Sequence, residues 1–295
     1  MKSIFNVMKS VKDKGIRRAT KVDLSTFVDY PVIDYSNGLA EGDKYKAFLF
    51  NFSESGHRYD FILSKKPEKK LFVIFSGSAN AKKLKLNPPV FQRWKWADQF
   101  PGSTLYISDP SLYMNEKLSL AWYIGTSCHD HHDTLSRVIM DVASHLGIEN
   151  NNIVGYGSSG GGFASLRMSA FISGMTSVAI NPQVIIKNYH EKAVNRFLKI
   201  CFKSSYSSFD FDENAKRFDI REAGIDQNAN RLILVQNIQD DLHYKKHFTP
   251  LCEYYGYRPD EVAHTNHFKS IKFSHPGGHT KAETQSVFKE IMRSL

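Results

Sequence analysis

Residues 153–165 read Ile-Val-Gly-Tyr-Gly-Ser-Ser-Gly-Gly-Gly-Phe-Ala-Ser, and this stretch decides the fold. An apolar run typical of a buried strand leads into a glycine-rich turn, and a helical pattern follows. Gly157, Ser159 and Gly161 match the spacing Gly-x-Ser-x-Gly. In such a strained strand-to-helix turn the serine oxygen projects from the sheet edge, and the flanking glycines avoid a Cβ clash. We therefore predict that Ser159 is a nucleophile at the N-terminus of a helix, whose dipole favours negative charge.

The same glycines also fit a second pattern. Gly155, Gly157 and Gly160 match the Gly-x-Gly-x-x-Gly pattern of dinucleotide-binding folds. However, this match lies in the middle of the chain, and the next predicted strand ends at Asn181-Pro182 without the acidic residue that binds a ribose. We favour the nucleophile turn, and a phosphate-binding or tightly packed turn is the alternative.

The rest of the chain alternates between predicted strands and helices. The predicted strands are residues 47–52, 58–63, 71–76, 104–108, 153–156, 177–181, 231–236 and 268–274. Several are apolar throughout, as in parallel strands buried on both faces, whereas the last alternates and is expected near a sheet edge. The predicted helices are residues 136–146, 160–171, 189–202 and 281–294. The pattern predicts an α/β fold with a mostly parallel, doubly wound sheet of about eight strands, led by an antiparallel hairpin.

The length of 295 residues suits one such domain, which we place at residues 46–295. Residues 184–230 interrupt the alternation and are expected to form a lid or cap at the carboxyl edge of the sheet. Residues 1–45 are predicted to be a basic N-terminal arm, because lysine and arginine dominate residues 1–22. A solvated arm is favoured there, and a basic amphipathic helix on the inner face of a membrane is the alternative. No apolar block suits a membrane span or a secretory signal, so we expect a cytoplasmic protein.

Charge and cysteine content exclude some classes of protein. The net charge of +9 suggests anionic partners, but it is not concentrated as in nucleic-acid-binding proteins. The three cysteines are widely spaced, which argues against a disulfide framework or a structural zinc site.

A cluster at residues 128–133 reads Cys-His-Asp-His-His-Asp and resembles a metal-binding sequence. It partly fits the His-x-His-x-Asp-His pattern of binuclear metallohydrolases, but Thr134 replaces the last histidine. We predict no metal site, and expect the cluster from His129 to Asp133 to have a structural or substrate-contacting role. Asp133 or Thr134 is expected to cap the helix that follows.

A serine nucleophile needs a base and an orienting acid, which in this kind of fold follow it in the order acid, then histidine. Asp240 follows the strand at 231–236 and is the predicted acid, with Asp241 as the reserve; helix capping is the alternative role for both. His279 follows the last strand after a pair of glycines and is the predicted base, with His275 as its alternative. The predicted fold is therefore that of the α/β-hydrolases.

Two backbone N–H groups are needed to hold the oxyanion that forms during acyl transfer. We assign one to Gly160, which follows the nucleophile. The other is assigned to Ser78, in the small-residue loop after the strand at 71–76.

Four motifs, at residues 157–163, 179–183, 240–243 and 277–279, carry a resemblance to a known family. Over about residues 70–295 the chain resembles an α/β-hydrolase-like family of O-acetyltransferases found in bacterial capsule and surface-glycan gene clusters. The resemblance implies a triad of Ser159, Asp240 and His279. It also implies O-acetylation of a glycan, with acetyl-CoA as co-substrate and no bound cofactor.

We therefore expect a serine acyltransferase acting on a capsular or cell-surface polysaccharide. A serine esterase with the same triad, and a non-catalytic glycan-assembly protein, are the alternatives. From charge alone, Lys187 and Arg196 of the insertion are expected to contact an anionic donor or acceptor. Trp122 is expected in the core, with stacking on a sugar ring as its alternative role.

Overall fold

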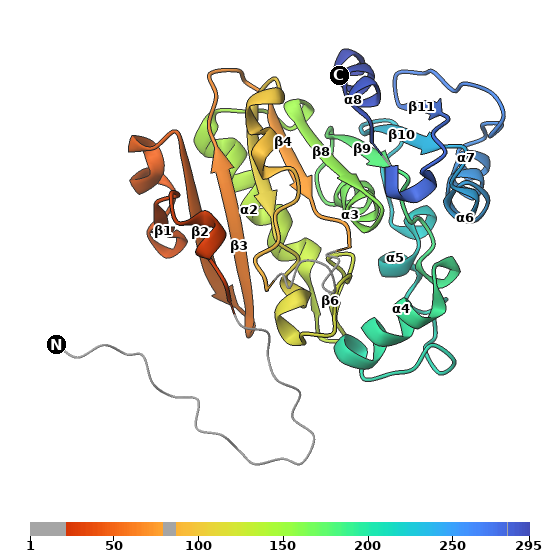
Figure 1. Ribbon diagram of the computed structural model, residues 1–295, viewed down its shortest axis with the longest axis horizontal. Helices are drawn as coiled ribbons and strands as arrows, with labels where there is room; N and C mark the ends of the chain where they lie inside the picture. The colour runs from red at the N-terminus through yellow and green to blue at the C-terminus, as the bar shows by residue number, and fades with distance from the viewer. Residues whose placement is uncertain (1–21, 79–86, 282) are drawn as a thin grey trace.

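The computed structural model describes residues 22–78, 87–281 and 283–295, and within them the chain forms a nine-stranded sheet flanked by helices on both faces (Figure 1). The strand order is β1-β2-β3-β5-β4-β8-β9-β10-β11. The bounds of these strands are β1 Val32–Asp34, β2 Ala47–Glu54, β3 His57–Ser64, β4 Leu71–Phe75, β5 Ser103–Ile107, β8 Ile153–Ser158, β9 Thr176–Ile180, β10 Arg231–Asn237 and β11 Phe268–Phe273.

The eight stretches predicted as strands all form strands, and the predicted fold class is confirmed. Strand β3 pairs antiparallel with both β2 and β5, whereas β4, β8, β9, β10 and β11 are mutually parallel neighbours. Strand β11 lies at one edge of the sheet, as its alternating sequence indicates. The carboxyl ends of β4, β8, β9, β10 and β11 therefore meet along one edge, where a site can form.

Helices cover both faces because each presents an apolar stripe to the sheet. Helices α2 (His131–Leu146) and α3 (Gly160–Met168) pack against one face together with β2 to β5. Helix α8 (Gln285–Ser294) packs against the opposite face through Val287, Phe288 and Ile291. The sheet is thus buried on both faces, and its carboxyl edge is where polar side chains can gather.

The first strand, β1, lies within the residues that we assigned to the N-terminal arm. It pairs in parallel with β2, with Val32 opposite Leu49, so the sheet begins before residue 46. Phe27, Ile33 and Leu39 are buried, and their burial holds residues 22–45 against the domain. The basic residues 1–21, on which the membrane prediction depends, lie outside the described residues.

Helix α2 begins earlier than predicted, and its cap differs. Asp130 is the N-cap, and its Oδ1 accepts a hydrogen bond from the His132 N–H at 3.1 Å. Asp133 and Thr134 lie inside the helix, so their predicted capping role is wrong. The helix ends at Gly147, which takes the left-handed conformation (φ 62°), as predicted.

Residues 184–230 form short helices joined by loops. Their helices are α4 (Glu191–Phe197), continued by a π-helical turn at Leu198–Phe202, and α5 (Ala215–Phe218). Phe197, Phe202, Phe209 and Phe218 form a chain of ring contacts that is continuous with the core beneath the sheet. Figure 1 shows α4 and α5 beyond the carboxyl ends of β8 and β9. Across the described residues, no helix combines the length and apolarity needed to cross a membrane.

Candidate active site

The turn between β8 and α3 has the strained geometry that the sequence predicts. Ser159 has φ 56° and ψ −121°, a conformation that costs a non-glycine residue about 1–3 kcal/mol. A Cβ on Gly157 would lie 2.3 Å from backbone atoms of Gly161, and a Cβ on Gly161 would lie 2.3 Å from the Phe75 carbonyl. The glycines are therefore required by close backbone contacts, and they hold the Ser159 side chain at the sheet edge.

Three side chains from three separate loops meet at this turn. His279 Nε2 lies 3.0 Å from Ser159 Oγ, and His279 Nδ1 lies 2.7 Å from Asp240 Oδ2. Asp240 follows β10, and His279 lies in a helical turn (Gly278–Lys281) after β11. This geometry allows His279 to take the proton of Ser159 while Asp240 fixes the orientation of the imidazole.

The reserve candidates lie elsewhere. Asp241 is exposed and pairs with Lys245 at 2.8 Å. The ring of His275 accepts a hydrogen bond from the Gly277 N–H at 3.0 Å. The structure therefore brings Asp240 and His279 to Ser159, and keeps Asp241 and His275 away from it.

Asp240 carries its charge in a largely buried setting. Burial alone would raise the pKa of this carboxyl, but hydrogen bonds from His243 and His279 outweigh burial and hold the pKa well below its usual range. Asn181 Nδ2 adds a further donor at 3.2 Å. Asp240 also caps the short helix α6 (Asp241–His243), so the capping role occurs together with its contact to His279.

Two side chains next to the triad had no predicted role. Gln183 Nε2 lies 2.9 Å from Ser159 Oγ and 2.6 Å from His243 Nε2. His243 Nδ1 lies 2.9 Å from Asp240 Oδ1. Both residues fall inside the motifs 179–183 and 240–243, but nothing in the sequence separates them from their neighbours. Their position was the available signal, because Gln183 follows β9 and His243 is three residues after Asp240.

Trp122 belongs to the core, and the alternative of sugar stacking is wrong for this conformation. Its side chain is fully buried and contacts Phe197 and Tyr189 edge to face. The indole N–H donates to Gln183 Oε1 at 3.1 Å. Trp122 therefore contacts the hydrogen bonds around Ser159 through Gln183.

The loop after β4 runs beside the nucleophile. A Cβ on Gly77 would lie 3.6 Å from Ser159 Cβ. The Gly77 N–H already donates to Gln92 Oε1 at 2.9 Å, and Gln92 Nε2 donates to the Ser78 carbonyl at 3.3 Å. The oxyanion role of the Ser78 and Gly160 N–H groups stays a prediction.

A buried ion pair fixes the loop that carries His279. Arg93 Nε donates to Glu283 Oε2 at 2.8 Å, and the two side chains are 10% and 4% exposed. Arg93 Nη2 also donates to Ser158 Oγ at 2.9 Å, and the Tyr156 hydroxyl donates to Glu283. The segment after His279 is thereby tied to β8, the strand that ends beside Ser159.

The cluster from His129 to Asp133 is held by protein partners. The Tyr59 hydroxyl bonds His129 Nε2 at 2.8 Å and His131 Nδ1 at 2.9 Å. Arg167 donates to Asp130 through two nitrogens. Among the described residues, the one group with metal-ligand spacing is instead Asp240, His243 and His279. The nitrogens of those two histidines that face Asp240 are engaged in hydrogen bonds.

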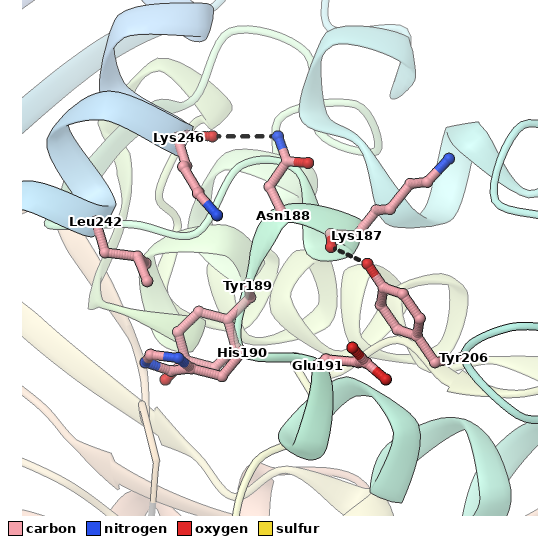
Figure 2. A pocket seen from close by; sticks show the side chains of 8 residues that line it. All are labelled: Lys187, Asn188, Tyr189, His190, Glu191, Tyr206, Leu242 and Lys246. Carbon is pink, nitrogen blue, oxygen red and sulfur yellow. Dashed lines mark hydrogen bonds between the residues drawn. The ribbon is translucent and has the colours of Figure 1, made fainter.

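A pocket of about 390 Å³ is lined in part by Leu242, which precedes His243 in the chain, and by Tyr189, whose ring is near that of His243 (Figure 2). Its lining residues are Lys187, Asn188, Tyr189, His190, Glu191, Tyr206, Leu242 and Lys246. The centroids of the Tyr189 and His243 rings lie 5.8 Å apart. Figure 2 shows the Lys246 ammonium turned into the pocket and the Lys187 ammonium turned away, where it lies 5.7 Å from the Phe211 ring. Arg196 does not line this pocket and instead bonds the Lys117 carbonyl at 3.4 Å.

Comparison with known proteins identifies similar structures but no similar sequences. No protein-family model and no curated protein matches the sequence. The capsule O-acetyltransferase of Neisseria meningitidis serogroup A superposes with a TM-score of 0.59 at 15% identity, over 82% of this chain and 94% of that chain. A chain of the glycosylation-associated Gap123 complex from Streptococcus agalactiae superposes with a TM-score of 0.57 at 16% identity. The match covers 83% of this chain and 46% of that chain. A fungal esterase from Rhizomucor miehei superposes with a TM-score of 0.52 at 13% identity, over 92% of this chain and 88% of that chain. These likenesses show that the chain has the α/β-hydrolase fold.

Proposed function

We propose that this protein is a serine O-acyltransferase with Ser159 as nucleophile, His279 as base and Asp240 as orienting acid. The observation that carries the proposal is the continuous hydrogen-bonded line from Ser159 through His279 to Asp240, at a strained turn between strand and helix. A serine placed in this way becomes nucleophilic because the histidine accepts its proton.

The reaction has two halves. Ser159 Oγ attacks the acyl carbonyl carbon while its proton moves to His279, and the N–H groups of Gly160 and Ser78 hold the oxyanion. The tetrahedral species collapses as the thioester C–S bond breaks, coenzyme A leaves as its thiol with the proton from His279, and an acetyl-Ser159 ester remains. A hydroxyl of the acceptor then loses its proton to His279, attacks the ester and carries the acetyl group away, and the proton returns to Ser159.

The acceptor that we propose is a capsular or cell-surface polysaccharide. Two similar structures support this class, one named as a capsule O-acetyltransferase and one as a glycosylation-associated complex. A related structure of the former is named as a complex with CoA, which supports a CoA-linked donor. The pocket beside Tyr189 is our candidate site for the acceptor, because aromatic, amide and charged side chains together suit a sugar with an anionic group. We place this reaction in the cytoplasm.

An esterase is the second candidate, since the arrangement fits water as acceptor equally well. The similar structures include esterases. The two activities differ in how well the site excludes water and binds the acceptor.

Labelling and turnover test the proposal together. A fluorophosphonate probe is expected to label Ser159, and Ser159→Ala is expected to abolish labelling, while Ser173→Ala, a change at an exposed serine beyond α3, serves as the control. With acetyl-CoA, added polysaccharide is expected to divert acetyl groups from free acetate to the polymer. Acetate release that polysaccharide leaves unchanged would show an esterase, and equal activity of Ser159→Ala and wild type would refute a serine mechanism.

A further inference from the structure

The hydrogen bonds around Ser159 continue past the triad and close into a ring. One path runs from Ser159 through His279 to Asp240 Oδ2. The other runs from Ser159 through Gln183 and His243 to Asp240 Oδ1. Gln183, His243 and Asp240 are each no more than 5% exposed, so no bulk water competes for these bonds. Ser159 and Asp240 are therefore joined twice.

Trp122 sets the direction of the second path. An indole N–H can only donate, so the atom of Gln183 that faces it at 3.1 Å is the amide oxygen. The amide nitrogen must then face Ser159 and His243 and donate one N–H to each. His243 Nε2 consequently carries no proton and acts as acceptor. Its ring proton lies on Nδ1, from which it is donated to Asp240.

This arrangement keeps His243 neutral at a place where its charge matters. The His243 and His279 rings are stacked, with centroids 4.0 Å apart and planes within 10°. His279 becomes a cation each time it takes the proton of Ser159, and a second cation in contact with it would oppose that step. Burial, followed by the neighbouring His279, lowers the pKa of His243 despite its bond to Asp240, in agreement with a neutral ring.

We infer that His243 is a positioning residue of the acyl-transfer reaction, and that Gln183 holds both the Ser159 hydroxyl and the neutral tautomer of His243. His243 and His279 each donate a hydrogen bond to one oxygen of Asp240. The bond from His243 thereby fixes the orientation of the carboxylate plane. The inference rests on the proposed function in one respect, that an acyl group is carried on Ser159. It is independent of the identity of the acceptor.

A spectroscopic test needs no turnover. In the full chain labelled with ¹⁵N-histidine, the ring signals of His243 are those missing from His243→Asn. They are expected to report the Nδ1–H tautomer, and His243 is expected to titrate at lower pH than an ordinary histidine. An Nε2–H tautomer, or titration of His243 near its ordinary value, overturns the inference.

A kinetic test compares substitutions of different chemistry at one position. His243→Phe keeps the stacked ring but removes both hydrogen bonds, and we expect kcat to fall by about 10²-fold with KM unchanged. His243→Asn keeps a donor at the position of Nδ1, and we expect a smaller loss of about tenfold. His264→Asn, at an exposed histidine, is the matched control. The substrate is p-nitrophenyl acetate, which acylates Ser159 without a glycan.

A pH profile separates positioning from general structural support. Without the His243 donor, the negative charge of Asp240 acts on His279 alone, so the acid limb of kcat/KM is expected to move upward by about half a pH unit in His243→Phe. The limb is expected to stay in place in His243→Asn.

Gln183→Glu provides a test if His243→Phe does not fold. The glutamate side chain has the same shape as glutamine, but its carboxylate offers Ser159 a competing acceptor. We therefore expect kcat to fall by about 10²-fold.

The outcomes distinguish this inference from the proposed function. If wild type acylates Ser159 while His243→Phe and Gln183→Glu match the His264→Asn control in kcat and pH profile, the inference is wrong and the proposed function stands. If Ser159 is never acylated, the proposed function fails, and the tautomer of His243 still decides whether the ring exists as described.

Discussion

Asp240, which is buried, and Asp130, which is partly buried, are two carboxylates beside histidines, and they are held in opposite ways. Asp240 receives its hydrogen bonds from two imidazoles and an amide. Asp130 is paired with the guanidinium of Arg167, whose side chain is 4% exposed. The pKa of each carboxyl lies well below its usual range in spite of burial, because of His243 and His279 for Asp240, and mainly Arg167 and His132 for Asp130.

The difference shows which region can do chemistry. The charge of Asp130 is already matched by a permanent cation, so little of it remains to stabilise a new one. The charge of Asp240 is met by neutral donors, so it can stabilise an imidazolium that forms on His279 during the reaction. A sequence rich in histidine and aspartate thus forms a structural cluster at residues 129–133, whereas the proposed catalytic group is assembled from three distant loops.

The largest effect is expected from removing the charge of Asp240. In Asp240→Asn we expect kcat to fall by about 10⁴-fold, because an amide can hold His279 in the wrong tautomer, as in other Ser-His-Asp enzymes. The free energy of unfolding is also expected to fall, because the hydrogen bonds that lower the Asp240 pKa stabilise the folded state at neutral pH. Asp241→Asn is the matched control, since Asp241 is exposed and pairs with Lys245, and its kcat is expected to equal that of wild type. Equal losses of kcat in Asp240→Asn and Asp241→Asn would contradict the assignment of Asp240 as the acid that orients His279.

Removing the charge of Asp130 is expected to affect stability instead of activity. In Asp130→Asn the buried guanidinium of Arg167 loses its counter-charge, and we expect the free energy of unfolding to fall by about 3–5 kcal/mol. Urea unfolding measures this change. The kcat per folded molecule is expected to stay within about twofold of wild type, because Asp130 has no contact with Ser159, Asp240 or His279 among the described bonds. A large loss of kcat in folded Asp130→Asn would mean that the two regions are coupled.

The sequence predicted the strands, and the three side chains that meet at Ser159, because both have local signals. Apolar runs locate β4, β8 and β10, and the glycine spacing around Ser159 is specific to one kind of turn. Gln183 and His243 carried no comparable signal, because their roles depend on which side chains meet across the sheet edge. Strand β1 was missed for a similar reason, since three residues leave little pattern and pairing with β2 decides its conformation.

An effect of pH on the free energy of unfolding, intermediate in size, is expected from one buried histidine in each region, His132 and His247. Burial, and then Arg167, lowers the pKa of His132 to about 4, and burial, and then His243, lowers the pKa of His247 to about 3. The unfolded chain, whose histidines titrate near pH 6.5, therefore binds more protons than the folded one between these values, so stability falls as the pH is lowered through this window. From pH 7 to pH 5 we expect each histidine to cost about 2 kcal/mol of unfolding free energy.

Replacing each histidine tests whether it causes the loss of stability between pH 7 and pH 5. His132→Phe, which can keep the stacking on Phe171, is expected to flatten the dependence of unfolding free energy on pH between 7 and 5. His247→Phe is expected to flatten it by a similar amount. If both variants keep the slope of wild type in urea unfolding at several pH values, then other groups account for the loss of stability in acid.

The smallest effect is expected at His129, and it tests the metal-like appearance of its sequence. His129 is partly exposed, and its Nε2 bonds the Tyr59 hydroxyl, a contact that the amide of glutamine can replace. In His129→Gln we expect the free energy of unfolding to change by less than about 1 kcal/mol, and kcat to be unchanged. Dialysis against a chelator is expected to leave the activity of both proteins as it was. A metallohydrolase would lose its activity in both experiments, because a ligand or the ion itself would be gone. Unchanged turnover after both treatments would therefore assign the chemistry to the Asp240 region, where neutral donors leave a carboxylate charge available for catalysis.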